Sequence, residues 1–142
     1  MLKGFSSLHG HSHFSLFDGL STPEENVKAA KAKGLTSIAL TDHGVNHGHA
    51  DLYLSGKKHG VKVVFGVEAY VLNSLVEWNA LKEKLSLDKK DKDFDKSVAA
   101  TGSKELRRKG HLVLLACNRK GLSNINTLVY RAGRALYVVR RY

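Results

Sequence analysis

The segment from Leu8 to Gly19 places histidines at alternate positions and ends with an acidic residue and a glycine. It reads L-H-G-H-S-H-F-S-L-F-D-G and contains His9, His11, His13 and Asp18. In extended backbone, residues two positions apart point to the same side, so we expect the three imidazoles to face one space. Such a strand can offer several ligands to a metal ion. The alternative is a solvated surface rich in histidine, and this segment alone does not decide between the two.

Further side chains of the types that bind metals follow the next two predicted strands. Asp42 and His43 come directly after the apolar run 37–41, in the motif T-D-H-G, and Glu68 follows the run 61–65, in F-G-V-E-A-Y. Functional side chains of parallel α/β sheets gather at the carboxyl ends of the strands. We therefore expect these residues to meet the histidine segment at one edge of the sheet.

The combination of imidazole and carboxylate donors indicates a catalytic metal site. These ligands suit zinc, manganese or iron, and the shortage of thiols argues against a structural zinc site of the cysteine type. Several clustered ions need bridging carboxylates, for which Glu68 and Asp18 are candidates. Two or more such ions polarise a phosphoryl oxygen, lower the pKa of a bound water and stabilise the leaving oxygen. Hydrolysis of phosphate esters is therefore the predicted chemistry.

The remaining polar residues near these motifs have simpler interpretations. Asp42 could be a ligand or could orient the histidine beside it, as outer partners of metal ligands do. His13 lies beyond the expected end of its strand, and ligand and surface roles are equally open for it. We expect His47 and His49 to be surface or capping residues, and His59 to stabilise a helix C-terminus through its charge.

Regular elements alternate between strand and helix along the chain. A capping box, T-P-E-E, and a later glycine predict a helix that starts at Thr22 and ends near Gly34. The other predicted helices cover 48–59, 74–85 and 123–139, and the predicted strands cover 5–11, 37–41, 61–65 and 111–116. Strands separated by helices in this order indicate right-handed βαβ units, so the predicted fold class is α/β.

Composition restricts the class of protein. The chain has 142 residues, of which 42% are hydrophobic and 25% charged, and this fits one globular domain. No apolar run approaches the roughly 20 residues of a membrane span, and the opening residues do not resemble a secretory signal. The single cysteine, Cys117, excludes an intrachain disulfide and favours the reducing cytoplasm.

The net charge of +10 is concentrated near the C-terminus. Residues 1–103 carry 13 Lys or Arg and 12 Asp or Glu, whereas residues 104–142 carry 10 basic residues and one acidic residue, Glu105. A segment this basic would attract nucleic-acid phosphates or acidic partners without sequence specificity. A solvated helical face would have a similar composition, and composition does not separate the two.

Taken together, the motifs resemble those of the PHP (polymerase and histidinol phosphatase) family. The resemblance is carried, in the family's order and spacing, by H-G-H-S-H-F-S-L-F-D-G, A-L-T-D-H-G and G-V-E-A-Y-V. It is closer still to the amino-terminal PHP domain of bacterial DNA polymerase III alpha subunits, because the later segment H-L-V-L-L-A-C-N-R-K-G-L-S-N is similar to that branch. The similarity covers about residues 5–132.

The resemblance implies the amino-terminal part of a distorted (β/α)7 barrel, with a metal site at the C-terminal ends of its strands. It implies a cluster of up to three divalent metal ions and adds one ligand to those inferred above. The full set is His9, His11, Asp18, His43, Glu68 and His111, of which the first five would also take part in catalysis. Some alpha subunits use this domain as a metal-dependent 3′–5′ exonuclease that proofreads, and others use it as a scaffold for a separate proofreading subunit.

The resemblance also implies a partial domain. The family's final ligand motif, Asp-x-His, is absent together with the palm, fingers and clamp-binding regions, and the basic tail 134–142 is unlike family sequence. We expect 1–142 to form a single partial PHP domain, with a charged surface loop at about 86–104 and no polymerase active site. The expected partners are DNA and the other subunits or remaining segments of a cytoplasmic replicative polymerase, with no membrane.

Two other functions are compatible with these motifs. One is a free-standing PHP phosphoesterase that hydrolyses a small phosphate ester such as histidinol phosphate. The other is a non-catalytic scaffold that binds a polymerase partner. The last segment quoted above favours the polymerase interpretation over the free-standing enzyme. Activity on a DNA 3′ end, activity on a small phosphomonoester, or activity on neither would separate the three.

Overall fold

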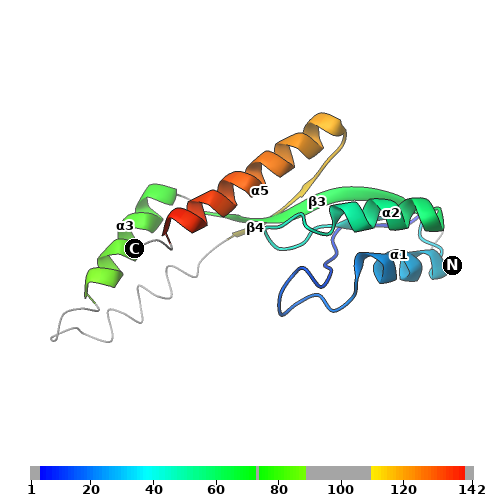
Figure 1. The fold of residues 1–142 in the computed structure, drawn as a ribbon, viewed down its shortest axis with the longest axis horizontal. Helices are drawn as coiled ribbons and strands as arrows, with labels where there is room; N and C mark the ends of the chain where they lie inside the picture. Colours follow the sequence, from blue (N-terminus) through cyan, green and yellow to red (C-terminus); the bar gives the residue numbers. More distant parts are fainter. Residues whose placement is uncertain (1–3, 73, 89–109, 140–142) are drawn as a thin grey trace. The chain divides into compact units, whose positions relative to one another are not determined.

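Strands and helices alternate along the chain, and the strands assemble into one sheet (Figure 1). The computed structural model describes residues 4–72, 74–88 and 110–139. Its elements are β1 (Ser6–Ser7), α1 (Pro23–Ala32), β2 (Ser37–Leu40), α2 (His49–His59), β3 (Lys62–Val71), α3 (Leu75–Asp88), β4 (Gly110–Leu115) and α5 (Arg119–Val139). The strand order is β1-β2-β3-β4, and β2 pairs in parallel with both β1 and β3. The predicted α/β class is confirmed.

The chain divides into two compact units. The first contains Met1–Ala69 and Val113–Tyr142, and the second contains Tyr70–Leu112. In the second unit, the Lys82 ammonium group of α3 lies 5.1 Å from the centroid of the Trp78 ring. The first residues of the charged loop predicted at about 86–104 belong to α3, which continues to Asp88, and the rest of that loop lies outside the described residues. Among the helices that are described, none is long and apolar enough to cross a membrane.

Helix α1 begins and ends where its sequence signals predict. The Glu25 N–H donates a hydrogen bond to the Thr22 side chain, and the Thr22 N–H donates to the Glu25 carboxylate at 2.7 Å, which completes the capping box. Pro23 occupies the first turn, where its missing N–H costs no helical hydrogen bond. After the helix, Gly34 adopts a φ of 74°, a left-handed conformation that helps to terminate it.

The core of the first unit lies between two helices and the sheet. Figure 1 shows α1 and α2 lying side by side, and the two helices pack against each other. Val27 of α1 and Leu52 of α2 form a buried cluster with Leu40 of β2 and with Val61. Burial of each such side chain stabilises the fold by roughly 1.5–3 kcal/mol. This cluster fixes both helices on the strands whose carboxyl ends carry the candidate ligands.

The ends of α1 and α2 are also joined by ion pairs. The Glu24 carboxylate accepts hydrogen bonds from His59 Nε2 at 3.1 Å and from Lys58 Nζ at 3.0 Å, and Lys28 Nζ lies 3.2 Å from it. These bonds, that of His59 above all, lower the pKa of Glu24 to about 2. His59 is the last residue of α2, as predicted, and it meets a carboxylate there.

Three elements extend beyond their predicted ranges: β3, α5 and α3, the last of which continues past 85 to Asp88. β3 continues beyond the predicted range 61–65 to Val71, so Glu68 lies inside a strand rather than after one. α5 begins at Arg119, earlier than predicted, because the Asn118 side chain accepts a hydrogen bond of 2.9 Å from a backbone N–H of the first turn. Asparagine is a favourable residue directly before a helix, and so the helix starts after Asn118 rather than at Ser123, the predicted start.

His49, the first residue of α2, is half-buried and connects this helix to β3. Its Nε2 donates a hydrogen bond to the Gly66 carbonyl oxygen at 2.8 Å, and its ring packs on Phe65 with 5.2 Å between the centroids. The expectation of a surface or capping role is therefore wrong for His49, whereas His47 is exposed. Burial lowers the pKa of His49, although the bond to the Gly66 carbonyl acts in the opposite direction.

The position of His49 predicts a loss of stability in mild acid. Because the pKa of His49 is lower in the folded chain than in the unfolded chain, the unfolded chain binds this proton first, and stability falls as the pH drops below about 6.5. We expect His49→Gln to remove a slope of at most about 1.4 kcal/mol per pH unit in that range. Denaturant unfolding as a function of pH measures it, with His47→Gln as the exposed control. An unchanged slope in His49→Gln would contradict this assignment.

Candidate metal centre

The pairing of β2 with β3 brings His43 next to Glu68. The parallel pairing continues past the end of β2, where these two residues form a bridge. The Glu68 N–H donates to the Asp42 carbonyl oxygen at 3.1 Å, and the Gly44 N–H donates to the Glu68 carbonyl oxygen at 2.9 Å. The juxtaposition of an imidazole and a carboxylate therefore follows from backbone register.

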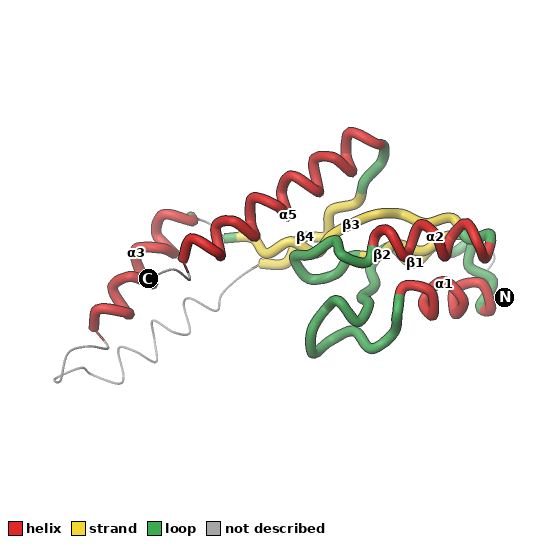
Figure 2. Tube along the Cα trace, in the orientation of Figure 1, coloured by secondary structure: helices red, strands yellow, loops and turns green. Residues whose placement is uncertain are grey.

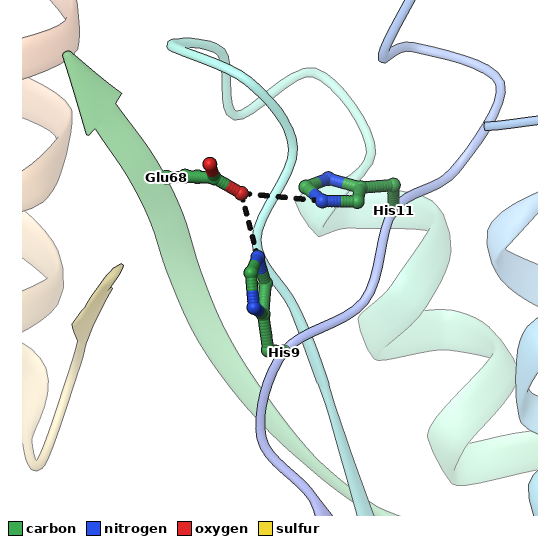
Figure 3. Close-up of side chains that lie close together, drawn as sticks. All are labelled: His9, His11 and Glu68. Atoms are coloured by element: carbon green, nitrogen blue, oxygen red, sulfur yellow. Dashed lines mark hydrogen bonds and ion pairs between the residues drawn. The ribbon is translucent and has the colours of Figure 1, made fainter. Parts of the chain in front are cut away.

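The loop between β1 and α1, drawn in Figure 2, brings two of the alternate histidines to the same place. β1 ends earlier than predicted. In the next part of the chain, a backbone N–H bonds to the side chain of the buried Thr41 instead of to a backbone carbonyl of β2. The Gly10 N–H donates to Thr41 Oγ1 at 3.1 Å, and the Thr41 N–H donates to the Gly10 carbonyl oxygen at 2.8 Å. His9 and His11, on either side of this glycine, both point toward Glu68 (Figure 3).

The Glu68 carboxylate lies among three imidazoles. Its Oε2 is 2.6 Å from His9 Nε2 and 3.2 Å from His11 Nε2, as Figure 3 shows. Its Oε1 is 3.7 Å from His43 Nδ1. The Glu68 side chain is 4% exposed, so this carboxylate forms the buried wall of the cluster. With nitrogen ligands facing both oxygens, Glu68 could contribute one oxygen to each of two neighbouring ions.

Asp18 forms the side of the cluster that faces solvent. Its Oδ2 lies 2.7 Å from His43 Nε2 and 3.7 Å from His11 Nε2. The Asp18 side chain is 53% exposed. The residue before it, Phe17, has a φ of 67°, an unusual conformation for a bulky side chain that marks a tightly folded loop. The cluster is therefore closed by Glu68 on one side and accessible at Asp18 on the other.

This donor set fits divalent metal ions. Within the first compact unit, two groups of three side chains each place their ligand atoms within 4.8 Å of one another; they are His9, His11 and Glu68, and His11, Asp18 and His43. The ring of His11, which belongs to both groups, stacks on that of His43 with 4.3 Å between the centroids. Imidazole nitrogens with carboxylate oxygens suit zinc, manganese or iron. Within the first compact unit, the structure thus brings together five residues predicted as ligands.

Two other predicted candidates, His13 and His111, are described separately. His13 is exposed, and its ring packs on Phe14 with 4.2 Å between the centroids. The expectation that three alternate imidazoles face one space is therefore wrong for His13, because the chain turns at this residue. His111 belongs to the second compact unit, where its ring meets that of Tyr70 edge-on at 5.0 Å. Its role as a ligand stays a prediction.

Three buried polar residues support the loop that carries the histidines. Asp42 and Ser15 are each 1% exposed, and Ser12 is fully buried. The Asp42 carboxylate accepts hydrogen bonds from the Ser12 N–H at 2.6 Å, the Ser12 hydroxyl at 2.8 Å and the Ser15 hydroxyl at 2.7 Å. The Asp42 carboxylate therefore holds this loop through the two serines, rather than through a direct bond to the His43 ring. Neither serine was singled out from the sequence. Their position within the histidine segment is the feature that could have marked them.

Gly19 allows the loop to fold back beside Asp18. A Cβ atom at Gly19 would overlap the backbone carbonyl group of Ser12. We expect Gly19→Ala to lower the free energy of unfolding by roughly 1–3 kcal/mol, as over-packing does. Gly133→Ala is the matched control, since a Cβ there meets nothing within 4 Å, and alanine favours a helix interior by about 1 kcal/mol. Denaturant midpoints measure both, and a neutral Gly19→Ala would contradict the tight loop.

Comparisons with known proteins connect this geometry to one family. The sequence model of the PHP domain matches residues 7–139. DNA polymerase III subunit alpha of Helicobacter pylori is 34% identical over 123 residues, which are 87% of this chain and 8% of that protein. The subunit alpha of Aquifex aeolicus is 32% identical over 136 residues, which are 94% of this chain and 10% of that protein. The chain therefore spans about a tenth of the length of these relatives.

A solved structure gives an independent view of the fold. An amidohydrolase from Chromobacterium violaceum, determined with bound sulfate and no metal, is similar over 86% of this chain and 32% of that chain. The TM-score is 0.52 and the sequence identity is 22%. The likeness concerns the fold alone, and it agrees with the α/β architecture expected for part of a barrel.

Proposed function

The chain belongs to the PHP domain family, and from this membership we propose that its cluster of side chains holds divalent metal ions and, in the intact domain, hydrolyses phosphate esters. The proposed ligands and catalytic residues are His9, His11, Asp18, His43 and Glu68, with His111 as a further ligand. The proposed substrate is the 3′ end of DNA, attacked as by a proofreading 3′–5′ exonuclease of a replicative polymerase. The observation that carries the proposal is the convergence of imidazole and carboxylate groups within 4.8 Å.

The positions of the side chains indicate what each would do. Divalent ions such as zinc, manganese or iron, when bound here, would polarise a phosphoryl oxygen and lower the pKa of a bound water. Glu68, with imidazoles near both oxygens, would join neighbouring ion sites. His9 and Asp18, each with a side chain 53% exposed, lie where a substrate can approach. A substrate would therefore approach the site from the side of Asp18, opposite the buried Glu68.

Charge balance favours a phosphate substrate. The five side chains that converge include two carboxylates and three imidazoles, and imidazole binds metals in its neutral form. The two carboxylates therefore offset the charge of one divalent ion. A second divalent ion would leave positive charge at the exposed side of the cluster, and this charge would attract a phosphate diester or monoester.

The relatives and the basic helix favour DNA over a small ester. The two relatives described above are DNA polymerase III alpha subunits that align with 87% and 94% of this chain. Helix α5 has no acidic residue in its sequence, and it exposes Arg119, Lys120 and Arg131. Such a face would attract a phosphate backbone. We therefore propose DNA and the other parts of a replicative polymerase as partners.

Two assays on the intact domain that contains this chain test this function, with metal binding measured on the same preparation. With Mn²⁺ or Zn²⁺ added, we expect a labelled DNA strand to be shortened from its 3′ end, and histidinol phosphate to be hydrolysed poorly. Glu68→Gln should lower the nuclease rate about 100-fold or more, which corresponds to about 2.7 kcal/mol in the barrier. Glu77→Gln, an exposed glutamate of α3, is the matched control.

The other outcomes have distinct meanings. Hydrolysis of the small ester alone would refute the DNA substrate and support a free-standing phosphoesterase. An intact domain that binds metal and acts on neither substrate would refute catalysis at this cluster and support a scaffold. Equal nuclease rates in Glu68→Gln and wild type would show that the activity does not arise at this cluster.

A further inference from the structure

The Ser15 hydroxyl lies between a buried carboxylate and two of the candidate ligands. Its Oγ donates a hydrogen bond to Asp42 Oδ1 at 2.7 Å. The same oxygen accepts a hydrogen bond of 3.1 Å from the His43 backbone N–H and lies 3.3 Å from His11 Nδ1. Ser15 is 1% exposed, so protein groups rather than solvent surround this hydroxyl.

Counting donors and acceptors at Ser15 assigns the proton of His11. A serine hydroxyl has one hydrogen and two lone pairs. The hydrogen is directed to Asp42, because a carboxylate only accepts, and one lone pair accepts the His43 N–H. The other lone pair can accept a second hydrogen bond, and among the described residues His11 Nδ1 is the group placed within reach of it. We propose that Asp42, acting through Ser15, holds His11 as the tautomer that carries its hydrogen on Nδ1.

This tautomer leaves the opposite nitrogen of His11 ready to bind a metal ion. His11 Nε2 lies 3.2 Å from Glu68 Oε2 and 3.7 Å from Asp18 Oδ2, and so it faces the ligand atoms of both groups. A ligating nitrogen must present a lone pair rather than a hydrogen. With the hydrogen on Nε2 instead, His11 would donate to a carboxylate and would be lost from both groups at once.

Asp42 also fixes the place of His11, by a separate contact. Its carboxylate accepts the Ser12 N–H at 2.6 Å, and Ser12 directly follows His11 in the chain. One buried carboxylate thus controls the position of the ring through the backbone and the hydrogen of the ring through Ser15. Asp42 and Ser15 are positioning residues, and their importance for function rests on the proposed metal centre.

Ser12 and Ser15 provide a matched pair of variants. Both are buried, and the hydroxyl of each donates one hydrogen bond to Asp42, but the hydroxyl of Ser15 is the one within hydrogen-bond reach of His11. Nitrogen-15 NMR of the imidazoles, recorded on the metal-free full chain, identifies directly which ring nitrogen of His11 carries hydrogen. We expect a hydrogen on His11 Nδ1 in wild type and in Ser12→Ala, and a shift toward Nε2–H in Ser15→Ala.

A titration with Zn²⁺ separates this inference from the proposed function. Ser15→Ala should weaken binding by roughly 10–100-fold, the usual effect of removing an outer partner of a ligating histidine, and Ser12→Ala should weaken it less. A wild-type chain with hydrogen on His11 Nδ1 and no zinc affinity would refute the metal centre and leave the tautomer assignment standing.

The assignment itself is overturned by two results. One is a wild-type spectrum with the hydrogen on His11 Nε2, which decides the matter without any variant should Ser15→Ala fail to fold. The other is an unchanged tautomer in a folded Ser15→Ala chain, which would show that the Ser15 oxygen does not hold the proton of His11.

Discussion

The burial of the Asp42 carboxylate is the constraint on which the rest of the site depends. A carboxylate withdrawn from water must be matched by hydrogen-bond donors, and here three donors come from Ser12 and Ser15. Each lost bond to such a group costs roughly 1–3 kcal/mol. The loop that carries His9 and His11 therefore cannot leave the end of β2 without exposing or orphaning this charge. Asp42 thus holds a flexible connection in one position.

Backbone pairing supplies the other half of the site. His43 and Glu68 meet because the parallel pairing of β2 with β3 extends beyond β2. The core between α1, α2 and the sheet keeps these strands in register. A hydrophobic cluster, a strand register and one buried carboxylate together gather side chains that lie far apart in the sequence.

Much of this arrangement could be predicted from the sequence, because it depends on local signals. The capping box at Thr22 marks the start of α1, and the position of His43 at the end of an apolar strand marks it as a candidate ligand. Histidine and carboxylate side chains can be recognised as possible metal ligands from their residue types alone. Glu68 lies with His9 and His11, where its motif places it, although its strand is longer than the sequence predicts.

The remaining features depend on contacts between distant residues, which spacing does not encode. β1 ends early where the side chain of Thr41 accepts the Gly10 N–H in place of a strand partner, and His13 lies outside the cluster because the chain turns there. His49 is half-buried because its Nε2 donates a hydrogen bond to the Gly66 carbonyl oxygen and its ring packs on Phe65. The roles of Ser12 and Ser15 become visible once Asp42 is seen to be buried. The family resemblance suggests His111 as a ligand, whereas its position at the start of a predicted strand does not.

The metal content of the purified chain tests the central claim most directly. Elemental analysis of the wild-type chain should find zinc, manganese or iron, and a His9→Ala, His11→Ala double variant should lose it. A His47→Ala, His59→Ala double variant, which removes two histidines outside the cluster, should retain the metal. Absence of metal from the wild-type chain after exposure to these ions, or equal metal in wild type and the His9→Ala, His11→Ala variant, would contradict a metal centre at these residues.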